Sequence, residues 1–114
     1  IAGFVISGSG AKTLLIRGVG PGLNQFGLTG TLANPRLELH TTVNGTDVTV
    51  ATNTGWGGTP ALTAAFAQVG AFNLPATSAD AVLMVSLEPG SYTAQVSGVG
   101  GTTGIALVEV YEVP

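Results

Sequence analysis

The stretch that decides the fold lies near the C-terminal end of the sequence. It reads Gly90-Ser91-Tyr92-Thr93-Ala94-Gln95-Val96-Ser97-Gly98, then Val99-Gly100-Gly101-Thr102-Thr103-Gly104, then Ile105-Ala106-Leu107-Val108-Glu109-Val110-Tyr111-Glu112. Two runs rich in β-branched and aromatic residues flank a segment of glycines and threonines. This pattern predicts a β-hairpin or a closely related strand pair.

The two runs differ in how their apolar residues are distributed. In the first run, Tyr92, Ala94 and Val96 share one face and polar residues share the other. Successive side chains of a strand point to opposite faces, so this strand is expected to have a core side and a solvent side. In the second run both faces are largely apolar as far as Val108, which predicts a strand covered on both sides.

The rest of the chain adds further strands and a single helix. Asn44-Gly45 is a strong two-residue turn signal, so residues 36–52 are expected to form a hairpin. Thr59 is a candidate N-cap with Pro60 at the first helical position, and the apolar spacing predicts a short helix that ends at Gly70. Other expected strands span residues 1–7, 12–19 and 81–88. We expect one all-β domain over residues 1–114, an antiparallel β-sandwich of jelly-roll or immunoglobulin-like type with about seven to eight strands and one short helix.

The segments between these elements carry weaker signals. Residues 22–35 are expected to form a loop anchored by Phe26, Leu28 and Leu32. The turn at residues 18–22 is rich in glycine, but no Lys-Ser or Lys-Thr pair follows it, so we interpret it as a turn between strands and not as a phosphate loop.

Composition limits the function. Only 8% of the residues are charged, glycine numbers 18, and the net charge is −3. Three basic residues cannot form the cationic patch that nucleic acid binding requires, so no nucleic acid partner is expected. No apolar run approaches the ~20 residues of a membrane-spanning helix. Without cysteine there are no disulfides or thiolate metal sites, and we expect no cofactor and no metal. Because the chain starts inside a strand pattern, we expect a mature form or an excised module.

Several strings resemble a repeat module of large secreted and cell-surface proteins of environmental bacteria. They are the two runs at residues 89–98 and 104–112, and the segments 1–8, 15–21 and 65–72, so the resemblance extends over nearly the whole chain. The resemblance implies an extracellular or cell-surface location and a non-catalytic structural or adhesive role. Such modules often have acidic residues just before the tryptophan, where this chain has Thr54 and Gly55, so any calcium site formed by those acids is not expected here.

The titratable residues give no strong catalytic pattern, and we expect no enzyme. His40 is the only histidine, so a Ser-His-Asp triad would need it, with Asp47 or Asp80 and one of the serines. No serine lies in a nucleophile-elbow context, and an exposed strand residue beside Glu38 is the simpler interpretation of His40. Asp47 and Asp80 are expected in turns, where carboxylates commonly bond their own backbone. A further group of carboxylates is expected to face solvent: Glu88, Glu109 and Glu112.

Trp56 is a candidate for carbohydrate binding. It lies on a glycine-rich loop, and an aromatic ring in such a loop of a β-sandwich can stack on a sugar ring. Sugar platforms generally use further aromatic residues, and only Tyr92 and Tyr111 remain for that role. A plug over the end of the sandwich is the alternative for Trp56.

The leading hypothesis is self-association. A chain with few charges and several strands that are apolar on both faces exposes more apolar surface than a monomer usually does. Copies of the chain are therefore expected to cover one another in a filament or surface assembly, with the N-terminal strand added to a neighbour's sheet as one route. A passive spacer repeat in an adhesin is the alternative. The expected contact residues are Ile1, Ala2, Phe4, Ile6, Val82, Met84, Leu107 and Tyr111.

Overall fold

The computed structural model of the chain, which describes residues 1–114, contains seven strands in two antiparallel sheets. The four-stranded sheet has the order β1 (Ala2–Ile6), β6 (Gly90–Gly98), β3 (Pro35–Val43), β4 (Thr46–Asn53). The three-stranded sheet has the order β5 (Ala81–Leu87), β2 (Lys12–Val19), β7 (Leu107–Glu112). The expected all-β sandwich is therefore confirmed. No helix in the structure is long and apolar enough to cross a membrane.

The space between the two sheets holds the first of two apolar cores. Inward residues of both sheets form it, as the alternation of apolar and polar residues predicts. Ala94 of β6 is completely buried there, with Tyr92 and Val96 packed beside it. The fully or nearly fully buried members are Ile6, Leu14, Ile16, Leu37, Leu39, Ala81, Leu87 and Ala94.

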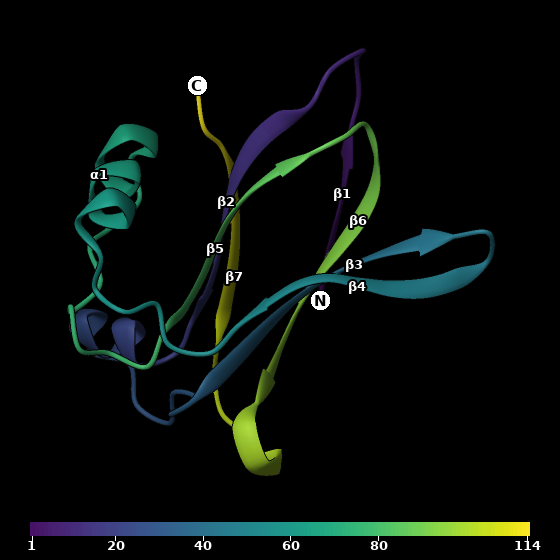
Figure 1. Ribbon diagram of the computed structural model, residues 1–114. Coiled ribbons are helices and arrows are strands. Elements are labelled where there is room, and N and C mark those ends of the chain that lie inside the picture. The colour runs from purple at the N-terminus through teal and green to yellow at the C-terminus, as the bar shows by residue number, and fades with distance from the viewer.

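A third layer covers the other face of the three-stranded sheet. Figure 1 shows α1 (Pro60–Val69) beside that sheet, on the side away from the four-stranded sheet. Ala65 and Phe66 of the helix pack with Leu15 of β2 and Val82 of β5 in the second core. This layer explains why Leu14, Leu15 and Ile16 are all buried, because β2 has a core on each face.

The helix forms where its sequence predicts. Pro60 occupies the first turn, and Gly70 ends the helix in the left-handed conformation (φ 76°). Thr59 has the extended backbone of an N-cap, but its side chain makes no capping hydrogen bond. Thr63 instead donates its backbone N–H to the Thr59 carbonyl oxygen at 3.1 Å.

The hairpin at Asn44-Gly45 is confirmed. Asn44 and Gly45 have φ values of 52° and 78°, the positive pair that a type I′ turn needs. The register between β3 and β4 shifts at Leu39/His40, where a bulge interrupts the pairing. In Figure 1 this hairpin extends well beyond the rest of the molecule, and we refer to residues 41–50 as the arm.

The expected hairpin between the two C-terminal runs is wrong. β6 pairs with β1 and β3, whereas β7 pairs with β2 in the other sheet. The connection passes through a short 3-10 helix, η2 (Val99–Gly101), and is tied to the loop before β3. Leu32 N–H donates to the Ile105 carbonyl at 2.8 Å, and Ile105 N–H donates to the Gly30 carbonyl at 2.9 Å. The chain thus crosses from one sheet to the other at the end of the sandwich.

Two smaller predictions about loops also need correction. Residues 22–35 begin with a 3-10 helix, η1 (Pro21–Phe26), which the sequence pattern did not predict. Of the three expected anchors only Leu32 is buried, whereas Phe26 and Leu28 are 57% and 43% exposed.

Candidate self-association surface

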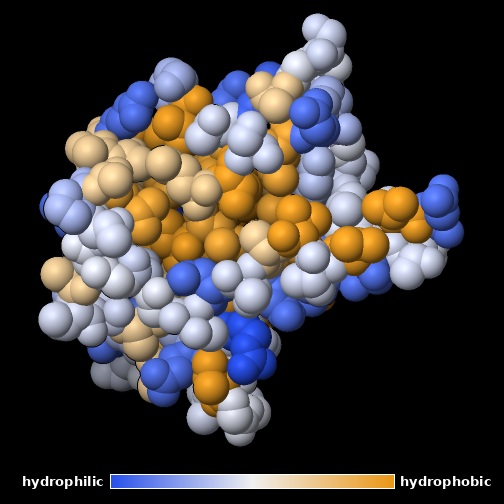
Figure 2. Space-filling model, in the orientation of Figure 1, coloured by the Kyte–Doolittle hydropathy of each residue, from blue (hydrophilic) through white to orange (hydrophobic).

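The exposed apolar residues gather on the arm and on the strands at the sheet edges. Val43, Val48 and Val50 of the arm are 51%, 39% and 42% exposed. They stay uncovered because the arm reaches past the three-stranded sheet that would otherwise face it. Figure 2 shows hydrophobic side chains over the middle of the molecule as it is seen in Figure 1. It shows them again along the projecting arm, whose tip is hydrophilic.

The residues expected in the contact are divided by the structure. Ile1, Met84 and Leu107 are 88%, 45% and 39% exposed, so they are available. Ala2, Phe4 and Tyr111 are partly buried in their own chain. Ile6 and Val82 are only 5% and 4% exposed. The expectation that these two residues contact another copy is wrong, because Ile6 belongs to the first core and α1 covers Val82.

The N-terminal strand pairs within its own sheet. β1 runs antiparallel to β6, with Phe4 opposite Tyr92 and the two rings stacked at 5.7 Å between centroids. Donation of this strand to a neighbour would remove Phe4 and Ile6 from the first core. Donation of the N-terminal strand to a neighbour is therefore not the route to assembly.

Sequence reasoning missed the valines of the arm. Residues 47–52 read Asp-Val-Thr-Val-Ala-Thr, and this pattern predicts only the partner strand of a hairpin. Their exposure depends on the length of the hairpin relative to the opposite sheet, and no local sequence pattern contains that information.

A polar cleft of about 520 Å³ lies on the outer face of the four-stranded sheet at the base of the arm. His40 lies at its edge with Nδ1 3.0 Å from Asp47 Oδ2 and Nε2 3.6 Å from Glu38 Oε1. The expected exposed His40 is wrong, because the residue is only 9% exposed. Its Nε2 is buried without a hydrogen-bond partner, so no hydroxyl is placed on it as a triad requires.

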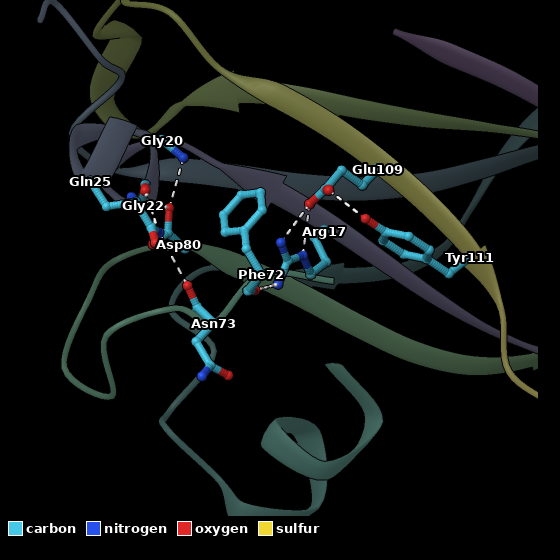
Figure 3. Close-up of polar contacts among 9 residues, drawn as sticks. All are labelled: Arg17, Gly20, Gly22, Gln25, Phe72, Asn73, Asp80, Glu109 and Tyr111. Carbon is cyan, nitrogen blue, oxygen red and sulfur yellow. Dashed lines mark hydrogen bonds and ion pairs between the residues drawn. The ribbon is translucent and has the colours of Figure 1, made fainter. Parts of the chain in front are cut away.

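A buried arginine supports the second core, as Figure 3 shows. The Arg17 side chain is completely buried, and its Nε donates to Glu109 Oε1 at 2.7 Å. Its Nη2 lies 2.7 Å from the same oxygen without hydrogen-bond geometry, so this second contact is an ion pair only. Nη1 donates to the Phe72 carbonyl at 2.7 Å, and the guanidinium carbon lies 4.7 and 4.4 Å from the ring centroids of Phe66 and Phe72.

Glu109 is thus a structural residue, and its expected solvent-facing position is wrong. Its Oε2 accepts a hydrogen bond from the Tyr111 hydroxyl at 2.5 Å. Burial raises the pKa of Tyr111 to about 12, and the hydrogen bond to Glu109 acts in the same direction. The pair holds the edge strand β7 against the arginine in β2.

Asp80 performs a similar task at the end of the sandwich. Its Oδ1 accepts the backbone N–H groups of Gly20 and Gly22 at 2.7 and 3.1 Å, and its Oδ2 accepts the Ser78 hydroxyl at 2.6 Å. The expected bond to the backbone of its own turn is wrong, because the carboxylate binds the backbone of a loop about sixty residues away and the hydroxyl of Ser78. The glycine-rich turn at residues 18–22 therefore holds an internal carboxylate in this fold.

Trp56 is buried in the second core and offers no ring face to a sugar. It is 5% exposed, its ring lies 5.1 Å from that of Phe66, and Nε1 donates to the Pro75 carbonyl at 3.1 Å. The glycan contact expected at Trp56 is therefore corrected. The ring closes the outer face of the three-stranded sheet, which is close to the plug alternative.

No group of three or more histidine, aspartate and glutamate side chains lies together in the fold as a metal site. Comparison with known proteins adds no further assignment. No protein-family profile matches the chain, and no match was found among curated proteins or solved structures.

Proposed function

We propose that this chain is a non-catalytic extracellular structural module that self-associates as the subunit of a filament or surface assembly. The observation that carries the proposal is the arm, a projecting hairpin with three exposed valines whose outer strand, β4, pairs with no other strand along its free edge. A surface of this kind commonly marks a protein–protein contact, since soluble monomers rarely leave such apolar patches uncovered.

The edges of both sheets support the same proposal. β1, β4, β5 and β7 each have one unpaired side. Natural sheet proteins protect such edges with lysine, proline or bulges. None of these four strands contains lysine or proline, and a bulge interrupts the β3–β4 pairing alone. β1 and β5 contain no charged residue at all, so nothing on them opposes the addition of another strand.

The extracellular location rests on the resemblance and on composition. A chain with few charges and no cysteine is compatible with a bacterial surface module that needs no disulfides. Localisation is tested by surface proteolysis of cells that express the parent protein, with detection of fragments from this segment. Cleavage only after lysis would contradict an exterior position.

Self-association is tested by light scattering coupled to size exclusion over a micromolar concentration series. We expect the wild type to form multimers and Val48→Lys to weaken association by at least about tenfold, because a lysine would be buried in the contact. Thr102→Lys, which adds the same charge at an exposed loop position, is the matched control and should associate like the wild type. A wild type that stays monomeric at every concentration would contradict the proposal.

A further inference from the structure

The pairing register arranges the four-stranded sheet in straight rows across its strands. One row contains Phe4, Tyr92, Thr41 and Val48, since each of these residues is paired with the next. A second row contains Ala2, Ala94, Leu39 and Ala51 in the same way. Because paired residues share a face, Phe4 and Val48 both lie on the inner face, at opposite edges of the sheet.

The strand directions allow the sheet to continue into another copy. β1 is antiparallel to β6, β6 to β3, and β3 to β4, so β1 and β4 run in opposite directions. A second copy shifted sideways along the sheet, and turned only by the ordinary twist between strands, therefore brings its β1 antiparallel to β4 of the first copy. The first row then continues, with Val48 beside Phe4 of the next copy. The bulge in β4 puts one extra residue between Val48 and Ala51, so Ala51 comes beside Ala2 when the same bulge is kept in the new pairing.

We infer that the unpaired edge of β4 in one copy binds the unpaired edge of β1 in the next copy, in this register. The inference rests on the proposed self-association and names the surfaces that meet. Such a contact is head-to-tail. Each copy is displaced along the sheet in the same direction and turned by the strand twist, so the repeat advances as a helix and produces an open assembly.

A cleft beside β1 favours this occupant. It has a volume of about 200 Å³ and lies between the two sheets at the β1 and β7 edges. Phe4, Leu14 and Val110 line it, and Val110 is 36% exposed. When β4 of one copy pairs with β1 of another copy, the arm of the first copy lies beside this cleft. The uncovered inner face of that arm, with Val43 and Val48, is then on the side where the cleft opens. The apolar projection at one edge of the molecule thus meets a recess at the other edge that is lined by five hydrophobic residues and by Ser7, Lys12 and Glu112.

The outer face provides a test that does not disturb the core. Val5 is opposite Ser91, and Thr42 is opposite Asp47, so Val5 and Asp47 lie one row beyond Phe4 and Val48. Val5 is 71% exposed and the Asp47 side chain is 68% exposed. Within one chain they are separated by three strand spacings of about 4.8 Å, beyond the ~7 Å limit on the Cα separation of a disulfide.

The chain has no cysteine, so the variant Val5→Cys/Asp47→Cys reports only contacts between copies. On mild oxidation we expect a ladder of covalent dimers, trimers and higher species on a non-reducing gel. The matched control is Val5→Cys/Thr52→Cys, whose second cysteine is exposed on the same strand but out of the Val5 row, and it should give no ladder. Thermal unfolding of the reduced proteins verifies that both variants fold.

The remaining outcomes overturn the inference in distinguishable ways. Wild-type multimers in light scattering with no ladder would mean that other surfaces associate, so the inference fails while the proposed function stands. Covalent dimers without larger species would indicate a closed contact and would also overturn it. A wild type that remains monomeric would overturn the proposed function and this inference together.

Discussion

Arg17 is the residue on which the second core depends most directly. A guanidinium removed from water needs a charged partner and hydrogen-bond acceptors. Glu109 provides the opposite charge and accepts from Nε, and the Phe72 carbonyl accepts from Nη1. The contact with the Phe66 and Phe72 rings adds a cation–π contribution. One side chain of β2 thereby connects β7, α1 and the segment after the helix.

Replacement of Glu109 by Gln should lower the free energy of unfolding by about 3 kcal/mol, because it leaves a buried cation without its counter-charge. Chemical denaturation measures the change. Glu112→Gln on the same strand is the matched control, since Glu112 is 61% exposed and its ion pair with Lys12 should contribute under about 1 kcal/mol. Equal losses in the two variants would contradict the structural role of Glu109.

The raised pKa of Tyr111 predicts that the free energy of unfolding declines at alkaline pH. Its pKa is about 12 in the folded chain against 10.0 for an ordinary tyrosine, so the folded state favours the neutral hydroxyl. The resulting stabilisation is complete below pH 10 and is lost as pH rises towards 12. Denaturation curves across this range should show the decline in wild type, and Tyr111→Phe should remove Tyr111's share of it. An unchanged decline in Tyr111→Phe would contradict the assignment.

Asp80→Ala should destabilise the chain by about 3 kcal/mol, because the buried N–H groups of Gly20 and Gly22 lose their acceptor. Ser78→Ala removes one donor to the same carboxylate and one of the two acceptors of the Trp56 Nε1–H, whose bond to the Pro75 carbonyl remains, and it should cost about 1 kcal/mol. Thermal unfolding of the two variants gives the comparison. A smaller loss in Asp80→Ala than in Ser78→Ala would show that the carboxylate does not hold the turn.

At the scale of elements, α1 decides how much of the three-stranded sheet is exposed. Phe66 is completely buried and packs against both Trp56 and the Arg17 guanidinium. The helix therefore covers Val82 of β5, which was expected in a contact between copies, whereas Met84 on the same strand stays exposed. Self-association rests on the arm and the sheet edges, which the helix leaves uncovered.

Phe66→Ala should cost about 4 kcal/mol, through lost burial and the cavity that remains. Phe26→Ala is a suitable control, because Phe26 is 57% exposed and contacts only the edge of the Phe72 ring, so its loss should be much smaller. Urea denaturation measures both. Similar losses in the two variants would mean that α1 does not seal the second core.

At the scale of the whole molecule, the small number of charges determines how assembly responds to salt. A net charge of −3 spread over few side chains leaves little electrostatic attraction or repulsion to screen. Assembly through apolar contacts and backbone pairing should respond to agents that act on hydrophobic burial and very little to ionic strength.

The association constant should therefore change by less than about twofold when sodium chloride is raised within the range that screens surface charges. Ammonium sulfate at equal ionic strength should strengthen association, because excluded salts favour apolar burial. Sedimentation velocity in the two salts is the measurement. Dissociation by sodium chloride would instead identify an ionic contact.

Much of the fold follows from local pattern. The apolar run in β2, the alternation in β3 and β6, the Asn44-Gly45 turn and the Pro60 to Gly70 helix are all fixed by interactions between near neighbours. The partners of the C-terminal strands are not, because a run such as β7 pairs equally well in either sheet by its own periodicity. The position of Glu109 beside Arg17 was missed for the same reason, since the two residues lie 92 positions apart.

Composition and local periodicity are enough to predict an all-β chain with too few charges to protect its sheet edges. Which apolar faces remain open depends on the tertiary packing. The helix covers one sheet face, β1 completes its own sheet, and the arm extends past the opposite sheet because strand lengths and crossings are set by packing between distant segments.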